Sequence, residues 1–502
     1  MEENRKRHCW ECLRRCLVCD STRPICKRCS TSGTVCPGYS DAKPARLRWL
    51  APGRVKSRNR RLKETPSNKI ENSHDEMTTR AMAELSRWTD DLVIPRFEIN
   101  TETCDLVQAA EYCKDNTCIY QDLIPIHQLG PNPYIYPVSP AHFQSGATLP
   151  DHLRLVFVCM ALSHRINRTR NDPQCKALAV TFYRYRGIVI RSLSEDINVE
   201  YKRTSDILLA GIISLLLADT QQGASPNWRC HLKGIERLIT LRGGIRALAG
   251  SKHLESLLLC FVFVSVIGNT TSPASDLALT SSHLDELDFI LEKYGGRIFT
   301  FHLCPPPLFA EIVKINHLRT LATKREPAGV GELSQEAYEI LSRIHGFSPE
   351  PWADSKPSSK EDWMLIGNVY QAAVALYCIS SLQSLSVLPL SHSLRSRCTT
   401  HSQSLYVLLN EALSSPKIKR FMLWPLVLLG VEAVNGGAAM RAFVEKQLPE
   451  ISRHVGTYVP LMAKGVLERF WASGEMRWDA CFDKPYALTT QIAIDISRIL
   501  PL

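Results

Sequence analysis

A cluster of cysteines near the N-terminus constrains this chain more than any other feature of its sequence. Of the 18 cysteines in 502 residues, seven fall within the first 36 positions. With Cys16 set aside, the other six follow the spacing C-x2-C-x6-C-x6-C-x2-C-x6-C, which is C-x2-C-x6-C written twice. A segment of about 30 residues cannot build a hydrophobic core alone, so bound metal or disulfide bonds must hold it together.

The spacing predicts a binuclear zinc cluster. A C-x2-C pair lets two thiolates reach one ion from a tight turn, at a Zn–S distance of about 2.3 Å. Each half then supplies three thiolates, one fewer than a tetrahedral zinc ion needs. Six thiolates supply the eight bonds of two zinc ions if two sulfurs bridge. The predicted ligands are Cys9, Cys12, Cys19, Cys26, Cys29 and Cys36.

The N-terminus favours metal over a disulfide framework, which is the main alternative. Met1-Glu-Glu-Asn-Arg-Lys-Arg7 has no apolar stretch behind its charges, so we expect no secretory signal and a reducing compartment. The longest apolar runs are Ile207–Ala218 and Leu257–Ile267. Both are well short of the roughly 20 residues that span a bilayer, and they predict buried core helices and no membrane partner.

Residues between the cysteines match a known pattern. Leu13-Arg14-Arg15 follows the second cysteine of the motif, Asp20 follows the third, and Pro24 precedes the fourth. Cys36-Pro-Gly-Tyr39 then ends the motif. With these features the segment resembles the DNA-binding domain of the fungal zinc binuclear cluster (Zn2Cys6) transcription factors.

The resemblance implies a function and roles for individual residues. It implies that Cys9 and Cys26 bridge two zinc ions, and that a short helix over Leu13–Leu17 enters the major groove of double-stranded DNA. Arg14 and Arg15 would then lie nearest the bases or phosphates, where arginine can bond guanine in a CGG-like half-site. Lys27 and Arg28 would contact the phosphate backbone.

Two positions depart from the family pattern. Cys16 and Val18 stand where the family often has basic residues, and a lost base contact typically removes about 1–3 kcal/mol of discrimination. Cys16 is interpreted as an unliganded thiol, although Cys16-x2-Cys19 is itself a C-x2-C pair. The alternative function is therefore an intracellular zinc-stabilised adaptor or co-regulator with weakened DNA reading.

Positive charge is concentrated in the same part of the chain. Residues 1–63 contain 17 Lys and Arg against 5 Asp and Glu, whereas the whole chain has a formal net charge of +10. The run Arg54–Lys63 is typical of phosphate contact and of nuclear import, and also of a solvated linker. Its position after the cysteine cluster favours the first two interpretations and predicts a nuclear location.

Composition divides the chain into three parts: a DNA-binding domain over 1–40, a flexible basic linker over 41–95, and a large all-α domain over 96–502. In the linker, Met77–Leu92 offers about two heptads of a coiled coil, or a short capping helix, so dimerisation stays open. Periodicity in the large domain predicts helices, and Pro425 should kink or shorten one of them. The predicted ranges are His152–Arg165, Lys176–Leu193, Ser205–Asp219, Trp228–Ile239, Ala310–Ala322, Gln335–Ile344, Trp363–Leu382, Leu394–Leu413, Ile418–Val434 and Tyr458–Trp471.

Segments of the large domain resemble the fungal-specific regulatory domain that often accompanies such clusters. They are Leu208–Leu217, Asn227–Ile235, Leu241–Gly244, Phe421–Pro425 and Gly430–Ala433. The resemblance implies that this domain binds the transcription machinery or co-regulators.

No catalytic motif of the common hydrolase, kinase, nucleotide-binding or zinc-protease types occurs. His231 is interpreted as a surface or core residue and not as a ligand. Glu432 is interpreted as a hydrogen-bonded core group, with a buried functional carboxylate as the alternative. An enzyme is the least favoured class.

Overall fold

The structure is a computed structural model of the chain, and it separates into two compact units, Met1–Arg96 and Phe97–Leu502. It describes residues 9, 12, 19–32, 36, 101–114, 124–130, 149–170, 172–222, 228–251, 254–295, 304–324 and 330–489.

The first unit contains the cysteine cluster and one described helix, α2 (Lys27–Thr31). Several predictions fall on residues outside the described ranges: the helix over 13–17 with Arg14, Arg15 and Cys16, the basic run, and the heptads over 77–92. The linker over 41–95 lies outside them as well.

The second unit is built of helices, and the residues described there include no strand. This agrees with the all-α fold expected from the periodicity. The α-helices are α4 (Thr101–Lys114), α7 (Asp151–Arg168), α8 (Cys175–Ile197), α9 (Glu200–Arg203), α10 (Asp206–Gln222), α11 (Trp228–Leu241), α12 (Ile245–Leu248), α13 (Glu255–Thr270), α14 (Thr280–Asp285), α15 (Leu287–Gly295), α16 (Pro306–Lys324), α17 (Val330–Gly346), α18 (Pro349–Asp354), α19 (Lys360–Ser384), α20 (His392–Ala412), α21 (Leu423–Val455), α22 (Val459–Ser473) and α23 (Trp478–Cys481). Short 3-10 turns are η1 (Ile124–Leu129), η2 (Ala274–Asp276) and η5 (Lys419–Phe421).

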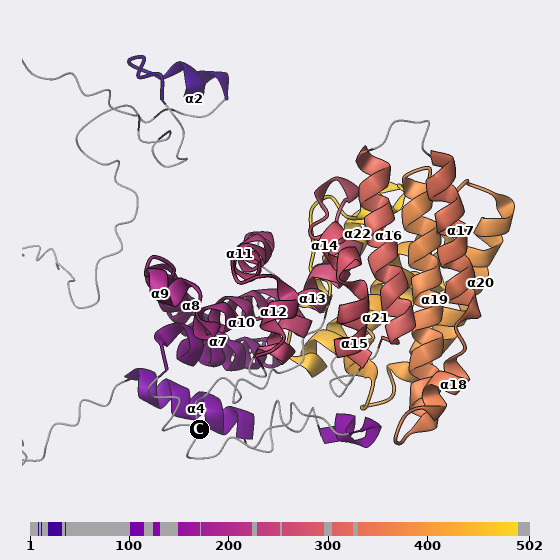
Figure 1. Ribbon diagram of the computed structural model, residues 1–502, viewed down its shortest axis with the longest axis horizontal. Helices are drawn as coiled ribbons and strands as arrows, with labels where there is room; N and C mark the ends of the chain where they lie inside the picture. Colours follow the sequence, from indigo (N-terminus) through magenta and orange to yellow (C-terminus); the bar gives the residue numbers. More distant parts are fainter. Residues whose placement is uncertain are drawn as a thin grey trace, which may run out of the picture. The chain divides into compact units, whose positions relative to one another are not determined.

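The helices form two packed groups within this unit (Figure 1). In the first group α7 packs on α4, α8 and α10, and α11 packs on α10. In the second group α19 packs on α16, α17, α20 and α21, and α21 packs on α22. Helix α13 contacts both α10 and α16, and its residues from Ser256 to Thr270 are all buried. The two groups therefore share one continuous hydrophobic core with α13 between them.

Each of the ten helices predicted from periodicity has a counterpart, and the apolar run Leu257–Ile267 lies in the buried helix α13. Helix α11 ends before Gly243 and Gly244, whose positive φ angles of 88° and 92° end the helix as expected. Pro425 shortens its helix as predicted, since α21 begins at Leu423 and holds this proline in its first turn. Helix α21 then continues far beyond the predicted end, across a break at Gly437.

Two helices, α19 and α21, are long and apolar enough by length and composition to cross a membrane. Their most apolar windows are 78% and 67% buried inside the protein, respectively. Core helices of a large α-helical domain have the same length and composition, and the burial of α19 and α21 places both in the core.

Two glycines that end helices offer a test of close packing. Gly456 after α21 and Gly474 after α22 both have positive φ, at 67° and 72°. A Cβ added at Gly456 would lie 2.2 Å from Cδ2 of His164, whereas one added at Gly474 meets nothing within 4 Å. We expect Gly474→Ala to lower the free energy of unfolding by about 1 kcal/mol through backbone strain alone. Gly456→Ala should lower it by about 3 kcal/mol, because the clash adds to the strain. Urea unfolding followed by circular dichroism measures both, and equal losses would contradict the packing against His164.

Candidate metal and DNA-binding site

The six cysteine sulfurs of the N-terminal motif converge into two groups of four. Cys9, Cys12, Cys19 and Cys26 form one group, and Cys9, Cys26, Cys29 and Cys36 form the other; within each group the sulfurs lie within 4.8 Å of one another. Five of the six side chains are buried and Cys36 is half-buried. Cys9 and Cys26 belong to both groups, so two ions could each take four sulfurs from six cysteines.

The sulfur spacing suits zinc. The Sγ atoms of Cys9 and Cys26 lie 3.6 Å apart, and Cys12 Sγ lies 3.7 Å from Cys26 Sγ. Four sulfurs at about 2.3 Å from one zinc ion stand roughly 3.8 Å apart in a tetrahedron. Cys9 Sγ is also 3.7 Å from Cys29 Sγ, across the second group. The donor set is all thiolate, which is the set of structural zinc sites.

The two C-x2-C turns have the same local geometry. The backbone N–H of Cys12 donates to Cys9 Sγ at 3.3 Å, and that of Cys29 donates to Cys26 Sγ at 3.3 Å. The backbone N–H of Cys9 donates to Cys19 Sγ at 3.4 Å. Such N–H donors favour the thiolate form of sulfur over the thiol. The sequence repeat is thus a structural repeat, with Cys26 as the N-cap of α2.

Without a cation these thiols resist ionisation. Burial and the neighbouring sulfurs raise the pKa of Cys9 and of Cys12 above the usual thiol range. The hydrogen bond that the Cys29 thiol donates to Cys26, followed by burial, raises the pKa of Cys29 to about 12. Packed sulfurs repel each other as anions, and a divalent metal ion removes that repulsion when it binds. The close packing of the six sulfurs therefore suits a metal-bound state better than a metal-free one.

Asp20 anchors the start of α2. Its Oδ1 accepts the backbone N–H of Lys27 at 3.2 Å and of Thr22 at 3.0 Å, and its Oδ2 accepts that of Arg28 at 2.9 Å. The hydrogen bonds from Thr22 and from the backbone of Arg28 lower the pKa of this carboxyl well below its usual range. An anion at a helix N-terminus is stabilised in this way. The carboxylate fixes the loop between the two halves of the motif.

Of the predicted DNA contacts, the structure describes two. Lys27 and Arg28 are exposed side chains in the first turn of α2, directly after the shared ligand Cys26. Arg14 and Arg15 lie outside the described residues, so their predicted contacts are untested.

The helical unit has a buried polar centre that the sequence interpretation missed. Arg319 on α16 is fully buried, and its guanidinium donates to the backbone carbonyls of Asn269 at 2.9 Å and Ser272 at 2.8 Å. It also donates to Asp479 Oδ1 at 2.8 Å and to the Tyr377 hydroxyl at 3.1 Å. A cation at the C-terminus of α13 satisfies the carbonyls that a helix leaves unpaired there.

A second buried arginine reaches the same end of α13. Arg229 on α11 donates to Asn269 Oδ1 at 3.0 Å and to Ser272 Oγ at 2.9 Å. Burial lowers the pKa of Arg229 to about 10. The only sequence signal for either residue was a cation within an apolar helix, as in His317-Leu-Arg319-Thr-Leu321.

His231 and Glu432 are structural groups, as interpreted. His231 Nε2 lies 3.2 Å from Oδ2 of the buried Asp219, which also accepts two hydrogen bonds of 2.7 Å from Arg186. Glu432 accepts from Ser380 Oγ at 2.7 Å and from Arg395 Nη2 at 2.5 Å. Both carboxylates therefore tie neighbouring helices together.

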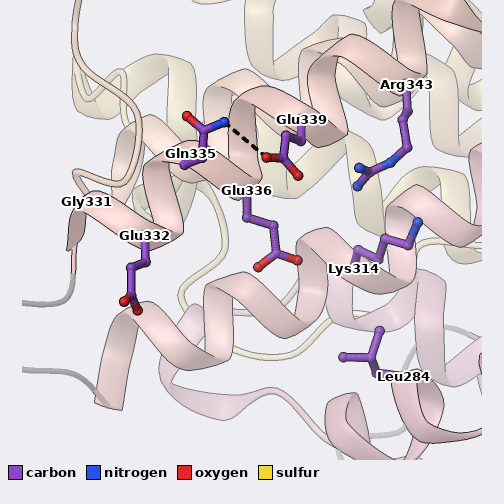
Figure 2. Close-up of a pocket in the computed structure, with 8 residues that line it drawn as sticks. All are labelled: Leu284, Lys314, Gly331, Glu332, Gln335, Glu336, Glu339 and Arg343. Carbon is purple, nitrogen blue, oxygen red and sulfur yellow. Dashed lines mark hydrogen bonds between the residues drawn. The ribbon is translucent and has the colours of Figure 1, made fainter.

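A groove on the helical unit is lined mainly by charged side chains (Figure 2). Its volume is about 780 Å³, and it is lined by Leu284, Lys314, Gly331, Glu332, Gln335, Glu336, Glu339 and Arg343. Glu332, Glu336 and Glu339 follow each other along α17 at spacings of four and three residues, which places them on one face. At the far end the buried Glu311 accepts from Lys314 at 2.8 Å and from Arg343 at 3.0 Å, so it offsets one of their two positive charges. The groove is negative overall and favours positively charged groups.

Comparisons with known proteins agree on one family. Residues 112–488 match the family described as fungal specific transcription factor domain. The chain is 50% identical, over 504 aligned positions, to the phomenoic acid biosynthesis cluster-specific transcriptional regulator of Leptosphaeria maculans. The alignment covers 99% of this chain and 92% of that regulator. No solved structure matches the chain.

Proposed function

The chain belongs to the fungal specific transcription factor family, and on that basis we propose that it is a nuclear, sequence-specific DNA-binding regulator of RNA polymerase II transcription. The observation that carries the proposal is the convergence of six cysteine sulfurs into two four-sulfur groups with two shared members. A chain that regulates transcription and carries such a module has a direct use for it in DNA binding.

Two zinc ions would hold the N-terminal module together. Cys9 and Cys26 would bridge them, Cys12 and Cys19 would complete one site, and Cys29 with Cys36 would complete the other. Bound zinc supplies the folding free energy that so short a segment lacks, on the order of 10–16 kcal/mol for structural zinc sites.

Four cations would make the DNA contacts. Arg14 and Arg15, on the short helix after Cys12, would reach the bases or phosphates of the major groove. Lys27 and Arg28 would contact the phosphate backbone from within the second C-x2-C pair. The exposure of Lys27 and Arg28 beside the buried cysteines supports this role. The basic run Arg54–Lys63 would add affinity that is independent of sequence, and a nuclear import signal.

The helical domain over 96–502 would receive signals and contact co-regulators. Its buried Arg319 and Glu432 are engaged in helix packing, which fits a domain that acts through its surface. Since its relative regulates a biosynthetic gene cluster, we infer that this chain controls the genes of a comparable cluster.

Selection of random duplex DNA by the zinc-loaded full chain tests the proposal. We expect enrichment of a CGG-like half-site, and loss of that enrichment when a chelator removes zinc. Cys16→Lys should sharpen the selection, because it restores a cation where the family reads a base. Binding that is steeply salt-dependent but blind to sequence would instead support the adaptor with weakened DNA reading.

A further inference from the structure

Two histidines from different helices meet at the surface of the helical unit. His345 lies in the last turn of α17, and His401 lies in the middle of α20. Their Nε2 atoms are 3.1 Å apart, and the two rings are inclined by 28° with centroids separated by 5.2 Å. His345 is exposed and His401 is half-buried, so water reaches the pair.

The spacing of these nitrogens suits a shared metal ion. Two imidazole nitrogens bound to one zinc ion at about 2.0–2.1 Å stand roughly 3.3 Å apart in a tetrahedron. The observed 3.1 Å is close to that value. Imidazole is a ligand that zinc and neighbouring divalent metals prefer. Solvent on the exposed side can supply the remaining ligands.

The surroundings hold the pair in place and keep it neutral. Gln371 on α19 donates to the carbonyls of Ile344 at 2.9 Å and Phe347 at 2.8 Å, which fixes the backbone that carries His345. Burial, with His345 and Arg397 nearby, lowers the pKa of His401 to about 4. Burial also lowers the pKa of His345, although the hydrogen bond from its ring to the Leu341 carbonyl acts to raise it. Neutral imidazoles offer lone pairs to a metal at pH 7, and the Leu341 bond leaves Nε2 as the nitrogen that faces outward.

We propose that His345 and His401 form a binding site for a divalent transition-metal ion, with Zn2+ as the expected occupant. The ion replaces the hydrogen bond between the rings and takes Nε2 of both histidines together with water. Because α17 and α20 each pack on α19, a bound ion links two helices through their outer surfaces (Figure 1). This site is independent of the cysteine cluster and lies in the other unit of the chain.

Zinc titration of the metal-depleted full chain by isothermal calorimetry tests the site at pH 7.5. We expect the wild type to bind one equivalent of zinc more than His345→Gln or His401→Gln. The matched control is His392→Ala, which removes an exposed histidine from the first turn of α20 and should behave as the wild type. Added zinc should also raise the thermal unfolding midpoint of the wild type and of the control, but not of the two pair variants.

The comparison is a difference between variants, so it does not depend on what the cysteine cluster binds. If the cluster takes no zinc, total binding falls equally in every variant and the increment from His345 and His401 persists. Equal zinc stoichiometry in wild type, His345→Gln and His401→Gln would overturn the proposal. Circular dichroism of each variant before titration separates lost binding from lost folding, and His345 is exposed enough for its glutamine variant to fold.

Discussion

Replacing Cys26 by serine is expected to remove both zinc ions from the chain and to abolish its selection of DNA. Cys26 belongs to both four-sulfur groups, so its loss leaves three sulfurs for each ion. Its sulfur also accepts the Cys29 N–H and caps the first turn of α2. Because metal binding and folding are coupled in such a module, the loss of metal is also the loss of the folded DNA-binding surface. Mass spectrometric metal analysis and duplex selection measure the two effects.

Matched cysteine variants make this result specific. Cys12 belongs to only the first group, so Cys12→Ser leaves Cys9, Cys26, Cys29 and Cys36 together and should keep at least one zinc ion. Cys230→Ser removes an exposed thiol of the helical unit and should keep both. Retention of two zinc ions by Cys26→Ser would contradict the shared role of this sulfur. Equal zinc losses in Cys12→Ser and Cys26→Ser would also contradict it, because Cys12 belongs to one group and Cys26 to both.

The convergence of the cysteine sulfurs could be predicted from the sequence because its determinants are local. Every sulfur pair within a C-x2-C turn is three residues apart, and the spacing alone limits the geometry. Asp20 also acts locally, since it caps a helix that begins seven residues later. By contrast, sequence spacing could not show which half-sites the DNA surface reads, since Cys16 and Val18 replace the expected cations there.

The positions of most long helices could also be predicted from the sequence, whereas their lengths and connections could be predicted less well. Apolar periodicity predicted α7, α10 and α19, and an uninterrupted apolar run predicted α13, because each buries a continuous face or is buried all round. The extension of α21 to Val455 was missed, because Gly436-Gly437 and Pro449 are typical helix breakers. Short helices such as α14 and α18 were missed as well, since a single turn has too few positions for a periodic pattern.

The polar centre of the helical unit depends on contacts far apart in the sequence. Arg319 contacts Asn269, 50 positions away, and Asp479, 160 positions away. Tyr377 extends this network by donating to Asn316 Oδ1 at 2.5 Å. A single sequence records the charge of Arg319 but not its partners, so the residue could not be distinguished from a surface arginine at a helix end.

Replacing Arg319 by methionine is therefore expected to have a large effect on stability, lowering the free energy of unfolding by about 3–5 kcal/mol. Methionine fills much of the volume but donates no hydrogen bond, so the carbonyls of Asn269 and Ser272 are left unsatisfied in the core. Asp479 loses its partner but is partly exposed, and water can compensate for that contact. Urea unfolding followed by far-ultraviolet circular dichroism measures the change, because the helical unit dominates that signal.

Two further variants separate the roles of charge and geometry in this network. Arg319→Lys keeps the charge but loses the planar fork that reaches the Asn269 and Ser272 carbonyls and Asp479, so we expect an intermediate loss. Arg237→Met removes an exposed arginine from α11 and should change the free energy of unfolding by less than about 0.5 kcal/mol. If Arg319→Met were as stable as the wild type, the carbonyls of Asn269 and Ser272 would have to find other donors. The buried arginine would then be a replaceable packing element and not the group that joins α13, α16, α19 and α23.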